Sequence, residues 1–391
     1  MLLVLGVERL RHEARSSFAS TVSGTDLIVG ARSGPVNLLL YAIFHVGDAT
    51  SNVSWKSYQD IAALPEVAWE VPISLGDSHR GFRVLGTSGE FFSRYRYADG
   101  AALRFAEGHA FDDLYDAVVG ARVAAKLNYR LGQSIVIAHG AGDVRQMLHA
   151  DKPFRIVGVL APTGTPVDET VAISVQAITA VHVDWQSGMR LPGRRVSAGQ
   201  ARQMDLTPTD ITAGLIGLKS RLAVFAVQRA INDYPDEPLL AILPGVTLQQ
   251  LWGLVGSAEN ALRAISFLVV LVGLFGMLTA LLTTLNERRR EMAILRAVGA
   301  SAGTVFLLLL LEAAVLASGG VLLGVALMYG VLALARAPIA EHLGIALSLG
   351  GLSASEWMLL GAVLGMALLA GCVPAWIAYR RSLIDGLQTR L

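Results

Sequence analysis

The apolar stretch AISFLVVLVGLFGMLTALLTTL, residues 264–285, decides the class of fold to which this chain belongs. It contains no charged residue, and at about 1.5 Å rise per residue a helix of this length crosses a bilayer core of roughly 30 Å. Similar runs follow at 302–335, interrupted only by Glu312, and at 357–379. Buried helices of a large soluble protein are the alternative, but such helices are usually shorter and amphipathic. The sequence therefore predicts membrane-spanning helices in its last third.

The composition of the whole chain agrees with a membrane protein. Of its 391 residues, 53% are hydrophobic and only 16% are charged, which is unusual for a soluble protein of several domains. The formal net charge of +1 supplies no basic field for a polyanion and excludes nucleic-acid binding as a function class. Cys372 is the single cysteine, so no intramolecular disulfide can form.

The distribution of arginines predicts the orientation of these helices. Arginines cluster in the connector 286–301 and follow the last apolar run in 380–391. Because basic residues near span ends are retained on the cytoplasmic side, both segments are predicted to be cytosolic. Residues 336–356 and 8–263 then lie on the other side of the membrane. The second of these is long enough for a large extracytoplasmic domain.

This domain is predicted to mix α and β structure. Compact or alternating β-branched runs predict strands at 82–86, 134–139, 154–160, 171–175, 211–217 and 239–243. Helical spacing predicts helices at 117–127 and 220–232, and apolar residues from Leu248 to Leu262 extend the first complete span into one long helix.

Residues 1–7, MLLVLGV, are apolar but too short to cross a membrane. They lack the basic region and the cleavage site of a signal peptide. We expect them to be the outer end of a truncated transmembrane helix, with the natural polypeptide starting upstream of Met1. A short buried apolar tail is the alternative.

The sequence carries no recognisable motif for catalysis, cofactor binding or metal binding. No Gly-x-x-x-x-Gly-Lys-Ser/Thr phosphate loop occurs, so the chain is not expected to hydrolyse ATP. Gly76-Asp77-Ser78 resembles a nucleophile block of esterases, but no Asp-x-x-His supplies the base, and we interpret it as a chance tripeptide. The histidines are scattered, and His182-x-Asp184 is interpreted as a surface pair on a strand. No catalytic, cofactor-binding or metal-ligating residue is predicted.

The connector has the pattern of a short amphipathic helix. A densely charged start is followed by apolar residues at helical spacing: Met292, Ile294, Leu295 and Val298. Gly299 suits a left-handed C-terminal cap, and Ser301 suits the N-cap of the next span. Such a helix can dock its apolar stripe into a groove of a partner. A positively charged turn that only fixes the topology is the alternative.

This connector, NERRREMAILRAVGAS at 286–301, resembles the signature of the FtsX-like permeases, the membrane subunits of MacB-type (type VII) ABC systems. In that family an E-R-x-x-E-[IM]-x-x-L-[RK] segment seats on the ATPase. Blocks resembling the MacB-type periplasmic core domain are GARVAAKL at 120–127, LGQ at 131–133, FRIVGVL at 154–160 and TGTPVD at 163–168, and PAWIAYR at 374–380 resembles the last helix of the family.

The resemblance implies a bundle of four transmembrane helices, the first truncated here, with a large α+β periplasmic domain inserted between spans 1 and 2. In chain order the expected parts are the end of helix 1 (1–7), the MacB-like periplasmic core domain (8–263), helix 2 (264–285), the cytosolic coupling segment (286–301), helix 3 (302–335), a periplasmic loop (336–356), helix 4 (357–379) and a cytosolic tail (380–391).

The resemblance also implies a function and its partners. A permease of this kind relays the ATP-driven motion of a separate ABC ATPase, which carries ATP and Mg²⁺, across the bacterial inner membrane to export or extract a substrate. The alternative is a non-transporting regulator that activates a periplasmic cell-wall hydrolase. A third, weaker class is a membrane-anchored periplasmic hydrolase, which would need a catalytic dyad that the sequence does not show. Expected partners are a second permease copy or paralogue, the lipid bilayer, and an adaptor, lipoprotein or hydrolase in the periplasm. The residues expected to couple to the ATPase are Glu287, Arg288, Arg290, Glu291, Met292, Ile294, Leu295, Arg296 and Gly299.

Two features lie inside the predicted spans. A lone carboxylate in hydrocarbon costs about 2.5 kcal/mol or more, so Glu312 is predicted to point inward, either as a proton relay or as a structural or dimer-interface carboxylate. The pairs Gly320-x-x-x-Gly324 and Gly361-x-x-x-Gly365 predict small-residue faces for close helix packing.

Overall fold

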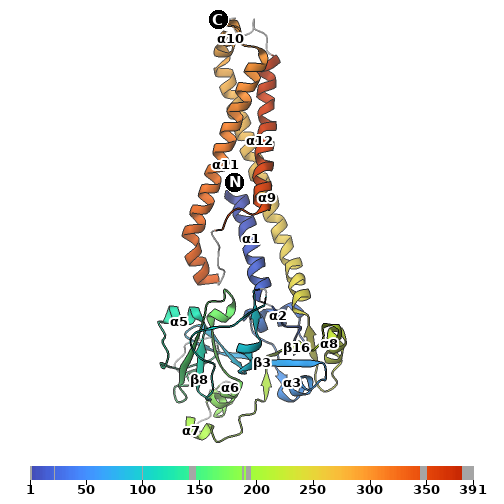
Figure 1. The fold of residues 1–391 in the computed structure, drawn as a ribbon, viewed down its shortest axis with the longest axis vertical. Helices are drawn as coiled ribbons and strands as arrows, with labels where there is room; N and C mark the ends of the chain where they lie inside the picture. Colours follow the sequence, from blue (N-terminus) through green and yellow to red (C-terminus); the bar gives the residue numbers. More distant parts are fainter. Residues whose placement is uncertain are drawn as a thin grey trace. The chain divides into compact units, whose positions relative to one another are not determined.

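A long strand, β3 (Val67–His79), organises the sheet-forming part of the chain in the computed structural model (Figure 1). Its first half pairs antiparallel with β16 (Ala213–Leu218). Its second half pairs with β4 (Phe82–Thr87) on one edge and with β10 (Ala138–His139) on the other. The structure describes residues 2–380 except 22, 99, 141–146, 187–188, 191–194 and 344–349, so part of the predicted loop 336–356 and nearly all of the tail 380–391 lie outside it.

Within these described residues, eleven strands form one mixed sheet. Its order is β17 (Leu239–Ile242), β1 (Leu27–Ala31), β16, β3, β4, β12 (Thr170–Ser174), β8 (Asp116–Val119), β11 (Phe154–Leu160) and β7 (Phe105–Gly108), with β9 (Ser134–Ile135) on β11 and β10 on β3. The pairs β4–β12 and β8–β11 are parallel. Two-stranded ribbons join β2 (Val53–Ser54) to β15 (Asp210–Ile211), β5 (Arg96–Tyr97) to β6 (Ala101–Ala102), and β13 (Trp185–Gln186) to β14 (Met189–Arg190).

Short helices cover both faces of this sheet. They are α2 (Pro35–Phe44), α3 (Trp55–Ala62), α4 (Glu90–Arg94), α5 (Ala121–Leu127), η2 (Pro166–Glu169), α6 (Val175–His182), α7 (Ala198–Ala201), η3 (Arg221–Ala223) and α8 (Val224–Asn232). Successive side chains of a strand point to opposite faces. Ile28 accordingly packs with α2, whereas its neighbours Leu27 and Val29 pack with α3 and α8. At the other end of the sheet, Val118 joins the first of these clusters, and Ala117 packs with α5 and α6.

Most strand predictions are confirmed within one or two residues, but the helix predicted at 117–127 is wrong over its first turn. Residues 116–119 form β8, whose side chains are all buried, and α5 begins only after Gly120. The pattern Ala-Val-Val fits either element, and burial on both faces of the strand decides it. The predicted strands 134–139 and 211–217 are each divided in two, and Val175 begins α6 rather than ending a strand.

Gly120 lets the segment 120–127 approach the segment 163–168 closely, and its substitution is expected to destabilise this domain. A Cβ at Gly120 would lie 2.3 Å from the carbonyl oxygen of Val167 and 2.4 Å from that of Asp168. Asp168 in turn accepts hydrogen bonds from the backbone N–H groups of Thr163 and Gly164 at 2.8–3.0 Å. Because backbone cannot yield as a side chain can, Gly120→Ala should lower the free energy of unfolding by about 1–3 kcal/mol.

The matched control for Gly120→Ala is Gly89→Ala. Gly89 has φ −59° and a built Cβ there meets open space, so the alanine should change stability by less than about 0.5 kcal/mol. Thermal or urea unfolding of the purified chain measures both variants. Equal midpoints for the two would contradict the close approach at Gly120.

The second unit of the chain is helical. Residues 1–14 and 255–391 form this unit, and residues 15–254 form the sheet domain, so the predicted domain 8–263 is longer than the compact unit. The helices are α1 (Leu2–Thr21), α9 (Pro244–Glu287), α10 (Arg289–Ala297), α11 (Ala302–Leu343) and α12 (Ala354–Arg380). The expected continuous helix through Leu248 is confirmed by α9, which is 44 residues long.

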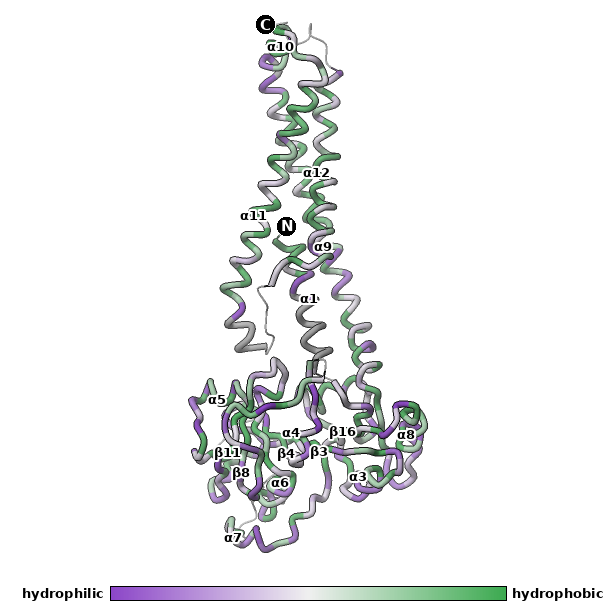
Figure 2. The backbone as a smooth tube through the Cα atoms, in the orientation of Figure 1, coloured by the Kyte–Doolittle hydropathy of each residue, from purple (hydrophilic) through white to green (hydrophobic). Residues whose placement is uncertain are grey.

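Three helices of the described residues are long and apolar enough to cross a membrane: Pro244–Glu287, Ala302–Arg336 and Ala354–Arg380. They contain the predicted runs 264–285, 302–335 and 357–379, and Figure 2 shows the apolar character along them. In α1, Leu5 is fully buried against Val321 and Met328 of α11. The start of the chain therefore packs with the helical unit, and the fourth span stays a prediction.

Candidate functional site

The helix α10 lies at one end of the helical unit (Figure 1), and one of its faces is apolar and exposed. Ile294, Leu295 and Val298 are 55%, 44% and 84% exposed. Their spacing of one, three and four residues places them on the same side of the helix, and the exposed side chain of Glu291 lies on that side too. We call Glu291, Ile294, Leu295 and Val298 the docking face.

The opposite side of α10 is attached to the spans. Ala293 is buried, and Met292 packs against a cluster formed by Leu285, Val305, Leu309, Ala375 and Ala378 of α9, α11 and α12. Met292, one residue of the predicted stripe, packs on the protein's own helices, and its role in coupling stays a prediction. One side of α10 is thus packed on the three long helices, and the other side is exposed.

The expected caps of the connector are confirmed. Gly299 has φ +110°, and the N–H of Ala300 donates to the carbonyl of Leu295 at 3.0 Å, closing the end of α10. Ser301 Oγ accepts from the N–H of Thr304 at 3.1 Å at the start of α11. Of the other predicted coupling residues, Glu287 ends α9, Arg288 forms the turn before α10, and Arg290 and Arg296 lie on α10.

The structure places Glu312 and the paired glycines of the predicted spans in different surroundings. A carboxylate oxygen of Glu312 lies 4.0 Å from Nη1 of Arg288, so a charge of the coupling segment faces this carboxylate; its role stays a prediction. A Cβ at Gly320, Gly361 or Gly365 would meet open space among the described residues, and Gly324 is buried. The prediction that these glycines pack closely against a helix, now one of a neighbouring chain, stays untested. Within this chain, Gly371 approaches Ala313 closely.

The sheet domain contains a second site, which sequence reasoning missed. Asp77, His139, His149 and His182 each offer one ligand atom, and these four atoms lie within 4.8 Å of one another. We call them the histidine cluster. His139 Nδ1 lies 2.9 Å from His182 Nε2 and 3.2 Å from Asp77 Oδ1, which is itself 3.4 Å from His182 Nε2.

Strand irregularity and a helix end place these side chains. The register of β3 against β4 shifts between Leu75 and Ser78, and Gly76 there has φ +151°, a conformation that favours glycine. Asp77 follows this bulge and pairs across the sheet with His139 of β10. His182 is the last residue of α6, which Ser174 caps by accepting from the N–H of Ala177.

His182 and Asp184 are therefore no surface pair on a strand. The Nδ1 of His182 bonds the carbonyl of Ile178, one turn earlier in α6, at 2.8 Å. Asp184 is fully buried and accepts from Nζ of Lys152, also fully buried, at 2.7 Å. A helix end and a buried ion pair replace the predicted strand.

Burial and mutual contacts set the charges of the cluster. Burial alone would raise the pKa of Asp77, but hydrogen bonds with His139 and His182 outweigh it and lower this pKa to about 2. Burial, reinforced by the charge of His182, lowers the pKa of His149 to about 4. Burial opposes a charge on His182, but its hydrogen bond with Asp77 raises its pKa. Asp77 is therefore ionised and His149 is neutral near pH 7.

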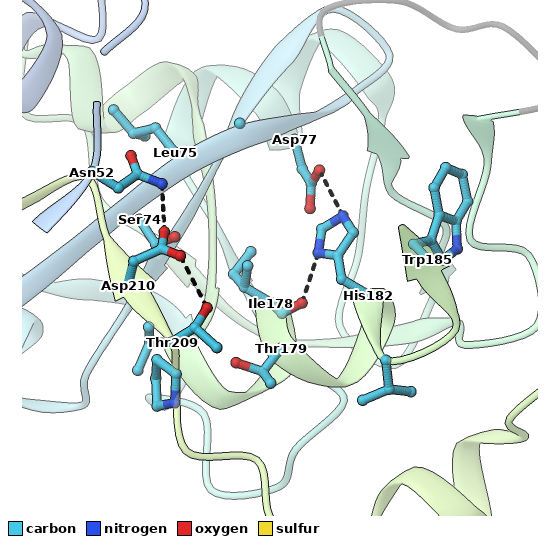
Figure 3. A pocket seen from close by; sticks show the side chains of 14 residues that line it. Asn52, Ser74, Leu75, Asp77, Ile178, Thr179, His182, Trp185, Thr209 and Asp210 are labelled. Atoms are coloured by element: carbon cyan, nitrogen blue, oxygen red, sulfur yellow. Dashed lines mark hydrogen bonds and ion pairs between the residues drawn. The ribbon is translucent and has the colours of Figure 1, made fainter. Parts of the chain in front are cut away.

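A cleft of about 460 Å³ opens beside the cluster, and Figure 3 shows Asp77 and His182 on its wall. Asn52, Thr209 and Asp210 lie across from them. The Nδ2 of Asn52 donates to Asp210, and the hydroxyl of Thr209 donates to the same carboxylate at 2.9 Å. The cleft thus gives solvent and small ions a route to the cluster.

Comparisons with known proteins agree with this architecture. A sequence model of the MacB-like periplasmic core domain matches residues 2–234, and one of the FtsX-like permease C-terminal region matches residues 263–384. The chain belongs to the family of ABC permeases that combine these two regions, and it is a membrane protein. Permeases of this family work with an ABC ATPase. The family resemblance and the fold class expected from the sequence are confirmed.

Individual relatives are distant. The pyoverdine export ATP-binding/permease protein PvdT of Pseudomonas aeruginosa is 26% identical over 313 residues, which are 74% of this chain and 42% of PvdT. The chain thus spans less than half the length of that relative. The periplasmic region of MacB from Actinobacillus actinomycetemcomitans matches with a TM-score of 0.36 and 11% identity, over 60% of this chain and 95% of that one. The extracellular domain of the noncanonic ABC-type transporter YknZ from Gram-positive bacteria matches with a TM-score of 0.32 and 13% identity, over 56% of this chain and 99% of that one.

Proposed function

We propose that this chain is the permease subunit of an ATP-binding-cassette complex in a bacterial inner membrane and that its docking face seats on the ATPase. The observation that carries the proposal is the exposed apolar surface of Ile294, Leu295 and Val298 on a helix between two candidate spans. An exposed apolar patch flanked by charges is typical of a protein contact. ATP and Mg²⁺ bind the ATPase, and this chain has no catalytic role.

The packing of α10 supplies the mechanism for the relay. Closure of the ATPase dimer on ATP displaces the docking face, and the buried contacts of Met292 and Ala293 transmit this displacement to α9, α11 and α12. Since α9 runs without interruption from Pro244 to Glu287, motion at its cytosolic end reaches residues near the sheet domain. The work is then done in the periplasm, with a second permease copy or a paralogue completing the complex.

Export or extraction of a substrate is favoured over regulation of a cell-wall hydrolase. The relative PvdT is a pyoverdine export protein, and its matched region covers most of this chain. We propose the same class of work here, with a periplasmic adaptor or a lipoprotein as further partner and with the substrate undefined.

Photo-crosslinking tests this proposal. With p-benzoylphenylalanine in place of Val298, which is 84% exposed, light should form a covalent adduct with the ABC ATPase, identified by mass spectrometry. The matched control is the same group in place of Leu222, which is 95% exposed and belongs to the sheet domain, and it should give no such adduct. An assembled complex that hydrolyses ATP but yields no adduct from position 298 would refute the proposed seating.

A further inference from the structure

We propose that the histidine cluster is a structural Zn²⁺ site, with Asp77, His139, His149 and His182 as its four ligands. The proposal is independent of the ATPase contact, because all four residues lie in the sheet domain. Three imidazole nitrogens and one carboxylate oxygen are a donor set typical of zinc.

The distances fit a tetrahedral ion. With Zn–N and Zn–O bonds of about 2.0–2.1 Å, neighbouring ligand atoms lie about 3.3 Å apart. The contacts that join Asp77, His139 and His182 are 2.9, 3.2 and 3.4 Å. All four ligand atoms lie within 4.8 Å of one another, so His149 needs only a small rotation or shift to complete the site.

Polar atoms without partners point to a ligand. The side chain of His149 is fully buried, and neither of its ring nitrogens has a hydrogen-bond partner among the described residues. The Oδ2 atom of Asp77, a residue that is only 3% exposed, is also unpartnered within this part of the chain. A buried polar atom of this kind is unfavourable in a folded protein unless something binds it. A cation at the centre of the cluster would bind His149 and the Asp77 carboxylate.

Surrounding groups orient the ligands as they do in zinc sites. The Nδ1–H of His182 donates to the carbonyl of Ile178, which leaves Nε2 as the atom that faces the cluster. The ring of Trp185 lies against His149, with centroids 4.5 Å apart, and limits its movement.

The charges around the cluster permit a cation. The positive charge of Lys152 acts on His149 and His182, and its ammonium group lies 2.7 Å from Asp184 and 3.6 Å from Asp151. These carboxylates offset its charge, so Asp77 supplies a net negative charge to the site. Each ligand nitrogen must be unprotonated when it binds the ion.

Four protein ligands define the class of site. A catalytic zinc keeps one position for water, whereas a structural zinc is closed by four protein ligands. The ion would join the bulge of β3, strand β10, the turn at His149 and the end of α6, while the cleft beside Asp77 and His182 gives it an entry path. The proposed role is therefore to fix these four segments to one another.

Metal titration of the full chain tests the site. The protein is purified in detergent through a tag without histidines, in a Cys372→Ala background that removes the free thiol, and is stripped with a chelator. We expect one Zn²⁺ per chain by elemental analysis, and Co²⁺ should give the strong visible absorption of tetrahedral coordination. Zinc should also raise the thermal unfolding midpoint.

Variants identify the ligands. His149→Ala and the nearly isosteric Asp77→Asn should weaken Zn²⁺ binding by more than the roughly 10- to 100-fold that loss of an outer-sphere partner costs. They should also remove the thermal shift. The matched control is His109→Ala, whose ring is 64% exposed and is not one of the four ligands, and it should bind zinc as the parent does.

Circular dichroism shows whether each variant is folded. If His149→Ala does not fold, Asp77→Asn still tests the site, because asparagine has nearly the same side-chain volume as aspartate. Binding of no zinc by the folded parent protein would overturn the proposal. Equal zinc binding by the parent and both folded ligand variants would overturn it as well. So would a Co²⁺ spectrum of octahedral type, because it would place the ion at another site.

Discussion

Replacing Leu295 by aspartate is expected to abolish the ATP-driven activity of the complex while leaving the permease inserted and folded. Leu295 lies in the docking face, is 44% exposed and is not part of the buried cluster that holds α10 on the long helices. In the complex, however, it would place a carboxylate in an apolar groove. Central interface residues of this kind contribute roughly 2–4 kcal/mol, which corresponds to about a 30- to 1,000-fold loss of affinity.

Co-purification with the ATPase and ATP hydrolysis in reconstituted vesicles measure this effect. Leu295→Met keeps an apolar side chain of similar volume and is the matched control, expected to retain most of the activity. Glu291→Lys reverses a charge on the same face, and we expect it to weaken the complex too. Undiminished recovery of an active complex with Leu295→Asp would leave the connector with a topological role only.

The membrane-spanning helices were predictable because their signal is local. Length and apolar composition within 264–285 suffice to identify a span, whatever it packs against. The caps at Gly299 and Ser301 were equally accessible, since each depends on the conformation of one residue and its near neighbours.

The inward turn of Met292 was not predictable from spacing. Met292, Leu295 and Val298 recur at three-residue intervals, which describes one side of a helix loosely. Which part of that side contacts the protein's own spans depends on the direction in which α9 enters the turn at Arg288. Only the packing of Met292 against the cluster that contains Val305 and Ala375 settles it.

The histidine cluster could not be predicted from the sequence, because its residues are brought together only by the topology of the sheet. Asp77 and His139 are 62 positions apart, and His139 and His182 are 43 apart, so no local spacing links them. Their meeting depends on β10 pairing with the second half of β3 and on where α6 ends. One usable signal was Gly76 before Asp77, since a glycine inside a strand pattern often marks a bulge that redirects a side chain.

Removing the carboxylate of Asp184 is expected to have the largest effect on stability in the sheet domain. The Nζ atom of Lys152 lies 2.7 Å from Asp184, and both side chains are fully buried. Among the described residues, Asp184→Ala would leave Asp151, 3.6 Å away and partly exposed, to offset the charge of the buried ammonium group. Loss of one partner of a buried ion pair costs roughly 3–5 kcal/mol, and the remaining carboxylate should place this variant toward the lower end of that range.

A double substitution separates the value of the pair from the cost of an unpaired charge. Lys152→Met together with Asp184→Leu removes both charges, and it should be much less destabilising than Asp184→Ala alone, because no buried ion is left behind.

The exposed pair of Lys56 and Asp236, with the same kind of contact at 3.0 Å, is the matched control. Asp236→Ala should leave the unfolding midpoint unchanged, since water already solvates both groups. Urea unfolding in the presence of a chelator measures all three variants without a contribution from bound metal. If Asp184→Ala proves as harmless as Asp236→Ala, Lys152 must lose its proton or reach solvent at little cost, and its charge would then not matter to the neighbouring histidines.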